Sequence, residues 1–244
     1  MNRLHLLLSL LLSATSLSAS EVTFQNGHEG YDGASDVTLS GELEKARLLN
    51  YGASETLDVA GVAAGGIRKL GLIRFADIVG PKRIPPGKAI LSARLELYKI
   101  KDAGNADTFS QLQPNQRFIY AHAMLRPWKA GSGNGDQDPD GATFSHQNSP
   151  EGVPVYWGKA NQIETGPVKG VDYQLTAPST SPLEQGAEAV WMQWDITEFF
   201  QDWVTNPEKN FGLLLTARSY YVGAQFSSCE SPDQQLRPRI VVTY

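Results

Sequence analysis

Cysteine is nearly absent from this chain: Cys229 is the only one in 244 residues. A single thiol cannot form a disulfide within the chain, so a small fold held together by disulfides is excluded. Cys229 ends a run that begins at Ala224 and alternates apolar with polar residues, a setting that favours a buried, unreactive thiol. Stability must therefore come mainly from a hydrophobic core.

An excess of basic residues is also lacking, since 21 Lys and Arg stand against 26 Asp and Glu, for a net charge of −5. Nucleic-acid binding needs concentrated Lys and Arg to neutralise phosphates, so we expect no nucleic-acid partner. The catalytic signals are sparse as well. After residue 20 the histidines are His28, His122 and His146, without metal-ligand spacing, and no Gly-x-Ser-x-Gly sequence occurs. We therefore predict a protein that is not an enzyme.

Long apolar runs are confined to the first residues. Arg3 is followed by the apolar stretch Leu4 to Leu12, and small residues end at Ser20. This order is typical of a secretory signal peptide, and the apolar run is too short for a transmembrane helix. We predict a signal peptide over residues 1–20, one secreted domain over residues 21–244, and no membrane insertion after cleavage.

Strand patterns dominate the rest. From Ile90 to Tyr98, apolar residues alternate with polar ones, which predicts one buried and one solvated face. The other predicted strands are 22–25, 36–40, 47–50, 56–59, 70–75, 117–124, 190–194, 211–217, 224–228 and 239–244. Many short strands without alternating helices predict an all-β fold, an antiparallel jelly-roll β-sandwich.

One short helix is predicted between late strands. Thr197 is a candidate N-cap, the apolar residues Phe199, Phe200, Trp203 and Val204 share one face, and Asn206-Pro207 ends the segment. The nearby Trp191 and Trp194 are three residues apart in a predicted strand. Because strand side chains alternate between faces, one indole should point inward and the other outward.

Residues 101–188 are rich in Gly, Asn, Pro, Ser and Thr, and long irregular loops are often functional. Sugar binding needs aromatic faces for stacking and a few polar groups for orientation. The candidates here are the aromatic residues Trp128, Tyr156 and Trp157 and the neighbouring cations Arg126, Lys129 and Lys159. Tyr220 and Tyr221 are further aromatic candidates, and ordinary packing is the competing interpretation for all five aromatic residues.

The same region holds half of a calcium-loop motif. Asp136, Asp138 and Asp140 alternate and are followed by Gly141, a spacing that lets carboxylates converge on a hard cation. Gln147 stands where a bidentate Glu is expected, and the segment lacks flanking helices, so this is not an EF-hand. Calcium binding and a solvated acidic turn both remain open.

Several segments, in the same order, resemble the DNRLRE domain, which is grouped with carbohydrate-binding module family 96. They are Gly30 to Ser40, Asn50-Tyr51-Gly52, Leu57 to Val59, Leu72-Ile73-Arg74-Phe75, Ile84-Pro85-Pro86-Gly87, Ala89 to Tyr98, Trp194-Asp195-Ile196-Thr197, Phe211 to Leu215, Phe226-Ser227-Ser228 with Glu230, and Arg237-Pro238-Arg239-Ile240. The departure is an expanded connection between Trp128 and Trp157. The resemblance implies a secreted jelly-roll module that binds polysaccharide, acidic in some members.

The leading hypothesis is therefore a secreted, non-catalytic module that binds an extracellular polysaccharide, with acidic polysaccharides as the candidate class and calcium as the one candidate cofactor. A structural or adhesive extracellular protein is an alternative. A polysaccharide lyase or hydrolase is another, using Tyr120 with His122 on one strand face, or carboxylates such as Asp172, Glu184 and Glu188.

Overall fold

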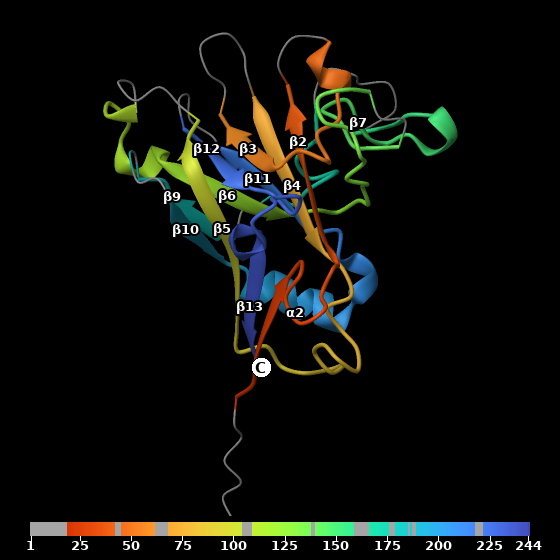
Figure 1. Cartoon of the computed structure of the whole chain (residues 1–244), viewed down its shortest axis with the longest axis vertical. Helices are drawn as coiled ribbons and strands as arrows, with labels where there is room; N and C mark the ends of the chain where they lie inside the picture. Colours follow the sequence, from red (N-terminus) through yellow and green to blue (C-terminus); the bar gives the residue numbers. More distant parts are fainter. Residues whose placement is uncertain are drawn as a thin grey trace, which may run out of the picture.

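A computed structural model describes residues 19–41, 45–61, 68–103, 109–137, 140–158, 166–175, 179–184, 186, 189–217 and 222–244. The fold is mostly β, with one large antiparallel sheet of eleven strands that curls around its core (Figure 1). These strands are β1 (Glu21–Gln25), β2 (Ala34–Ser40), β3 (Thr56–Ala60), β4 (Lys69–Phe75), β5 (Ser92–Asp102), β6 (Phe118–Ala123), β9 (Ser179–Pro182), β10 (Val190–Asp195), β11 (Leu213–Ala217), β12 (Gly223–Ser227) and β13 (Arg239–Thr243).

The remaining elements are small. Strands β7 (His146–Asn148) and β8 (Val155–Tyr156) form a separate two-stranded sheet, and α2 (Thr197–Thr205) is a short helix between β10 and β11. Single 3₁₀ turns occur at η1 (Ala46–Leu48), η2 (Pro114–Gln116), η3 (Pro150–Gly152), η4 (Pro207–Lys209) and η5 (Gln234–Leu236). The large sheet runs β1-β13-β5-β12-β3-β4-β11-β6-β9, with β10 added beside β5 and β2 beside β4.

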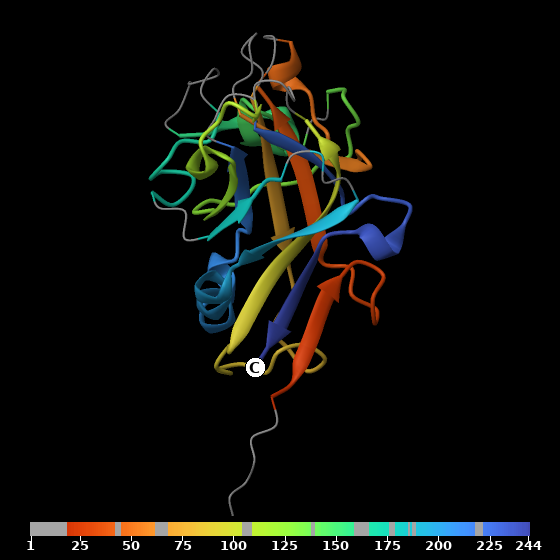
Figure 2. The same cartoon turned by 90° about the vertical axis from the view of Figure 1, so that its left-hand side faces the viewer.

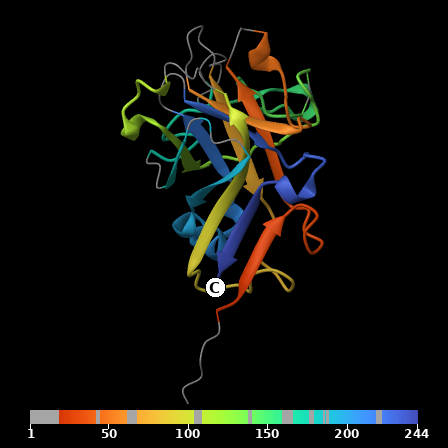
Figure 3. The same ribbon diagram turned by 60° about the vertical axis from the view of Figure 1, so that its left-hand side comes forward.

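Strand β5 organises one half of the sheet because three strands pair with it. Its alternating sequence buries Ala93, Leu95 and Leu97 in the core and turns Arg94, Glu96 and Tyr98 to the other face. Strand β10 lies along one edge of β5, while β13 and β12 share the opposite edge. Figures 2 and 3 show β5 in yellow crossing the molecule beside β13 and β10.

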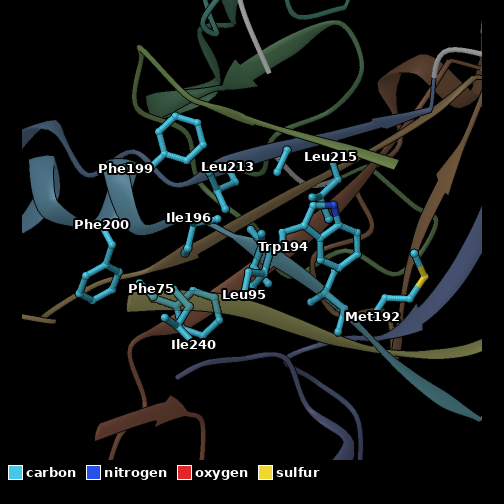
Figure 4. Packing of buried hydrophobic residues seen from close by; sticks show 14 of the residues in the cluster. Phe75, Leu95, Met192, Trp194, Ile196, Phe199, Phe200, Leu213, Leu215 and Ile240 are labelled. Carbon is cyan, nitrogen blue, oxygen red and sulfur yellow. The ribbon is translucent and has the colours of Figure 1, made fainter. Parts of the chain in front are cut away.

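The main core lies inside the curl of the sheet. Trp194 is fully buried at its centre, and its indole N–H donates to the carbonyl of Ile119, so its one polar atom is satisfied. Figure 4 shows Trp194 among Leu95, Leu213 and Leu215, which come from strands β5 and β11. Burying side chains of this size supplies about 2–3 kcal/mol each in transfer free energy.

Helix α2 packs against this core as its sequence predicts, because the four apolar residues of its stripe are all buried. Its start differs in detail from the prediction. Thr197 is the first helical residue rather than the cap, and the Asp195 carboxylate accepts hydrogen bonds from the backbone N–H and the hydroxyl of Thr197. These bonds lower the pKa of Asp195, because they favour its charged form.

A second hydrophobic cluster covers the opposite face of strands β2, β4 and β11. The strands contribute Val37, Leu39, Leu70, Leu72 and Leu214, and the covering layer contributes Met124, Trp128, Ala142, Phe144, Trp157 and Tyr173. Strands β4 and β11 are therefore buried on both faces. Much of the irregular middle segment, expected to form an exposed binding face, instead closes a core.

The strand expected at residues 47–50 is wrong, since η1 occupies Ala46–Leu48. Asn50 follows this turn, and its fully buried side chain holds another loop. Its Nδ2 donates to the carbonyls of Ala130 and Ala142, and its Oδ1 accepts from the backbone N–H groups of Gly52 and Gly133. The backbone N–H groups of Leu48 and Leu49 donate locally, to the carbonyls of Lys45 and Ala46, so a 3₁₀ turn takes the place of a strand ladder.

Candidate functional site

The two predicted sugar-stacking tryptophans lie in the second core. Trp128 is 6% exposed and Trp157 is fully buried, and their indole N–H groups donate to the carbonyls of Phe211 and Thr143. Both rings pack on the sheet because the middle segment needs large apolar side chains to cover β4 and β11. Their assignment to a sugar-stacking surface is therefore corrected, since neither indole presents a face to solvent.

The other members of the predicted ligand set are spread over the same layer. Tyr156 is half-buried on β8. The Arg126 guanidinium donates to the Gly158 carbonyl and to the fully buried Asp172 carboxylate at 3.2 Å, while Lys129 lies 3.4 Å from Asp140 on the surface. Lys159 lies outside the described residues, as do Tyr220 and Tyr221. Arg126 thus serves to fasten loops together.

The acidic loop is held in place by Asn50, through hydrogen bonds between the Asn50 backbone and the backbones of Asp136 and Gly135. Asp136 is exposed, and its Oδ1 accepts from the backbone N–H of Asn134 at 2.8 Å. Asp138 lies outside the described residues. In the described part of the chain, no three His, Cys, Asp or Glu side chains converge as metal ligands would. Calcium binding at this loop stays a prediction.

The residues considered for catalysis occupy different places. Tyr120 and His122 share one face of β6, as expected for residues two apart, with ring centroids 6.5 Å apart. His122 is 2% exposed, and its ring packs edge-on against Tyr173 at 5.0 Å. Asp172 is saturated by Arg126 and by the backbone N–H groups of Gly158 and Val168. Among the other carboxylates, Glu184 is exposed and Glu188 lies outside the described residues.

A more open arrangement lies on the outward face of β10, β5 and β13, which we call the platform. It is built from three rows of paired residues. Gln193, Glu96 and Arg239 form the middle row, Trp191 and Tyr98 form the row on one side, and Asp195, Arg94 and Val241 form the row on the other side. Trp194 points inward and Trp191 outward and is half-buried, which confirms the prediction from their spacing.

The platform is centred on a buried carboxylate. Glu96 is 3% exposed and contacts three side chains: Arg239 Nε at 2.8 Å, Arg94 Nε at 3.5 Å and Gln193 Nε2 at 3.1 Å. Both arginines therefore engage Glu96 through Nε. In the part of the chain that the structure describes, the Nη atoms of Arg94 and Arg239 make no hydrogen bond to protein. Arg94 also lies opposite the exposed Asp195 on β10, and its charge helps to lower the pKa of that carboxyl.

Aromatic rings border the cations. The Arg239 guanidinium lies over the Trp191 ring, 4.1 Å from its centroid, and the Tyr98 ring meets Trp191 edge-on at 5.4 Å. A guanidinium stacked on an indole is attracted to the ring and held in one orientation. Arg94 is the more exposed arginine, with 44% of its side chain accessible. The platform thus offers two cations that Glu96 anchors, an amide and a half-buried indole, with the exposed Asp195 carboxylate beside Arg94.

A groove of about 360 Å³ adjoins the platform at the edge of β10. It lies between β10 and β9, and Trp191 and Gln193 line it together with Lys99, Ser181 and Glu184. The two strands pair with β5 and β6 respectively.

The sequence reasoning missed the platform because its residues come from three distant segments. One signal pointed to it: the three-residue spacing of Trp191 and Trp194 places an indole on the solvent face of a strand. Neither models of known protein families nor curated proteins yield a match to this chain. Within the described residues, no helix combines the length and apolar character needed to cross a membrane.

Proposed function

We propose that this protein binds an extracellular acidic polysaccharide through the platform on β10, β5 and β13, without catalysing a reaction. The observation that carries the proposal is the pair of arginines, Arg94 and Arg239, which the buried Glu96 engages through Nε and whose side chains stay 44% and 31% exposed. Guanidinium groups bind carboxylates and sulfates through paired, charge-assisted hydrogen bonds. The anchoring lowers the conformational entropy lost when the ligand binds.

The neighbouring side chains suit a sugar ring. The indole of Trp191 provides apolar surface for the C–H groups of a pyranose, and the exposed Gln193 amide has a donor and an acceptor for hydroxyls. An open sheet face admits the middle of a long polymer as well as its end, whereas a closed pocket would select chain ends. This suits recognition of a polymer.

Three further features belong to the same proposal. The curled sheet is a jelly-roll sandwich of the DNRLRE type, a view supported by its two strand sets, β1-β13-β5-β12-β3 and β2-β4-β11-β6-β9, which are joined by the single pair Ala60–Lys69. Residues 1–20 direct secretion, as their composition suggests. The Asp136–Asp140 loop binds calcium, and a chelator would then alter that loop rather than the platform.

Affinity electrophoresis and calorimetry against alginate, pectin and a sulfated glycan test the proposal. Arg94→Ala is expected to weaken binding about tenfold or more, since hydrogen bonds to charged groups contribute about 1.5–3 kcal/mol. Trp191→Ala is expected to weaken it as well, through loss of the ring and of the support for Arg239. Lys82→Ala, which removes an equal charge from an exposed residue elsewhere, is the matched control.

The proposal fails if no acidic glycan binds, or if Arg94→Ala and Lys82→Ala behave alike. A specific protein partner without glycan binding would instead favour the structural or adhesive alternative. Release of unsaturated or reducing ends from the glycan would favour a lyase or hydrolase, and loss of that release in Tyr120→Phe would assign it to the β6 face.

A further inference from the structure

The groove beside the platform differs from it in charge. Lys99 lines the groove, but its Nζ is held by the Asp102 carboxylate at 2.7 Å and the Glu184 carbonyl at 2.9 Å, and its side chain is 1% exposed. Glu184 itself is exposed at the groove. The cation is therefore neutralised within the protein, and the carboxylate faces incoming ligand.

The rest of the groove is suited to uncharged polar groups. Apart from Lys99 and Glu184, its lining is uncharged: Ser181, Pro182, Val190, Trp191, Met192 and Gln193. The groove also runs along two strand edges, those of β9 and β10, whose backbone groups can exchange hydrogen bonds with hydroxyls. Figure 1 shows β9 and β10 running next to one another at one side of the sheet.

The two surfaces are contiguous. Trp191 and Gln193 belong to both, and the Arg239 guanidinium lies 4.1 Å from the centre of the Trp191 ring. A chain that contacts Arg239 and Arg94 and continues toward β10 therefore places a neighbouring unit at Trp191 or in the groove. A carboxylate on that neighbour would face Glu184 across a space without an available cation.

Resting on the proposed function, we infer that the ligand is a polymer in which an acidic sugar alternates with an uncharged one. The acidic unit binds the guanidinium groups of the platform, and the uncharged unit occupies the groove between β9 and β10. Glu184 acts there as a specificity residue, because its charge repels a second acidic unit while its oxygens accept hydrogen bonds from hydroxyls.

The test compares three polymers by calorimetry: polygalacturonate, acidic at every unit; hyaluronan, in which an acidic unit alternates with an uncharged one; and neutral dextran. The wild-type protein is expected to bind hyaluronan about tenfold more tightly than polygalacturonate, and not to bind dextran. Glu184→Gln should raise the affinity for polygalacturonate about threefold by removing one repulsive charge, so the preference for hyaluronan should fall. Glu184→Lys should raise the affinity for polygalacturonate further. Glu208→Gln, at an exposed site elsewhere, is the control.

Equal or tighter binding of polygalacturonate by the wild-type protein would overturn this inference alone, and the platform proposal would stand. An unchanged preference in both Glu184 variants would overturn it in the same way. Failure to bind either acidic polymer, or binding of dextran alone, would overturn the inference, and the proposed function would fall with it if alginate and a sulfated glycan also fail to bind.

Discussion

Asp36 is a carboxylic acid buried in the core, and it makes the stability of the fold depend on pH. It is 3% exposed on β2, opposite Ile73, and its Oδ2 accepts a hydrogen bond from the Cys229 backbone N–H at 2.6 Å. Burial raises its pKa from 3.8 to about 7, although hydrogen bonds from Cys229 act in the opposite direction. Asp36 is therefore protonated in the folded protein over a range in which the unfolded chain has released the proton.

The sign and size of the effect follow from this difference. Below pH 3.8 both states hold the proton, and above pH 7 neither does, so the change is confined to the interval between them. Within it, the free energy of unfolding falls as pH rises, by about 4 kcal/mol in total from this group. Asn keeps the acceptor for the Cys229 N–H without the charge, so Asp36→Asn should lose this pH dependence.

Urea unfolding of wild type and Asp36→Asn between pH 4.5 and pH 8 measures the effect, because other titrations cancel in the difference between the two proteins. The free energy of unfolding of the variant, relative to that of the wild type, should increase steadily as pH rises and stop changing above pH 7. Asp32→Asn, which makes the same substitution at an exposed position, is the control. A flat difference for Asp36→Asn would refute the reasoning.

Three other expectations concern stability and can be measured by urea unfolding. Asn50→Ala removes four side-chain hydrogen bonds to buried backbone groups and should cost about 2–4 kcal/mol; a cost below about 0.5 kcal/mol would show that water replaces them. Trp194→Ala should cost about 3–5 kcal/mol, whereas Trp191→Ala should cost about 1 kcal/mol, and equal costs would contradict the two-faced strand. Asp172→Ala should cost about 3 kcal/mol and expose the amide of Gly158 to hydrogen exchange, because it leaves two backbone N–H groups unpaired; unchanged exchange would contradict that.

Some parts of the structure could be predicted from the sequence, and others could not. The period-two pattern of Ile90 to Tyr98 correctly indicated which side chains of β5 face the core, because alternation is a local property of a strand. The buried face of α2 was predicted for the same reason, because the spacing of apolar residues along a helix is also a local property. The apolar residues that precede Cys229 correctly predicted that its thiol is buried.

The site was harder to predict because it depends on pairing between distant segments. Glu96 meets Arg239 only because β13 pairs with β5, and it meets Gln193 only because β10 does. The composition of residues 101–188 could not indicate that Trp128 and Trp157 cover a sheet, since that requires knowing that β4 and β11 are apolar on both faces. A tryptophan in a polar loop looks the same in sequence whether it is a ligand contact or the centre of a second core.

The most direct test of the central claim is to map the bound polysaccharide on the protein. Backbone amide chemical shifts should be recorded while an acidic oligosaccharide is added to the ¹⁵N-labelled protein. The platform predicts that the amides of residues 94–98, 190–193 and 239–241 shift together with one affinity. Shifts confined to the acidic loop around Asp136, or to the layer that holds Trp128 and Trp157, would contradict it.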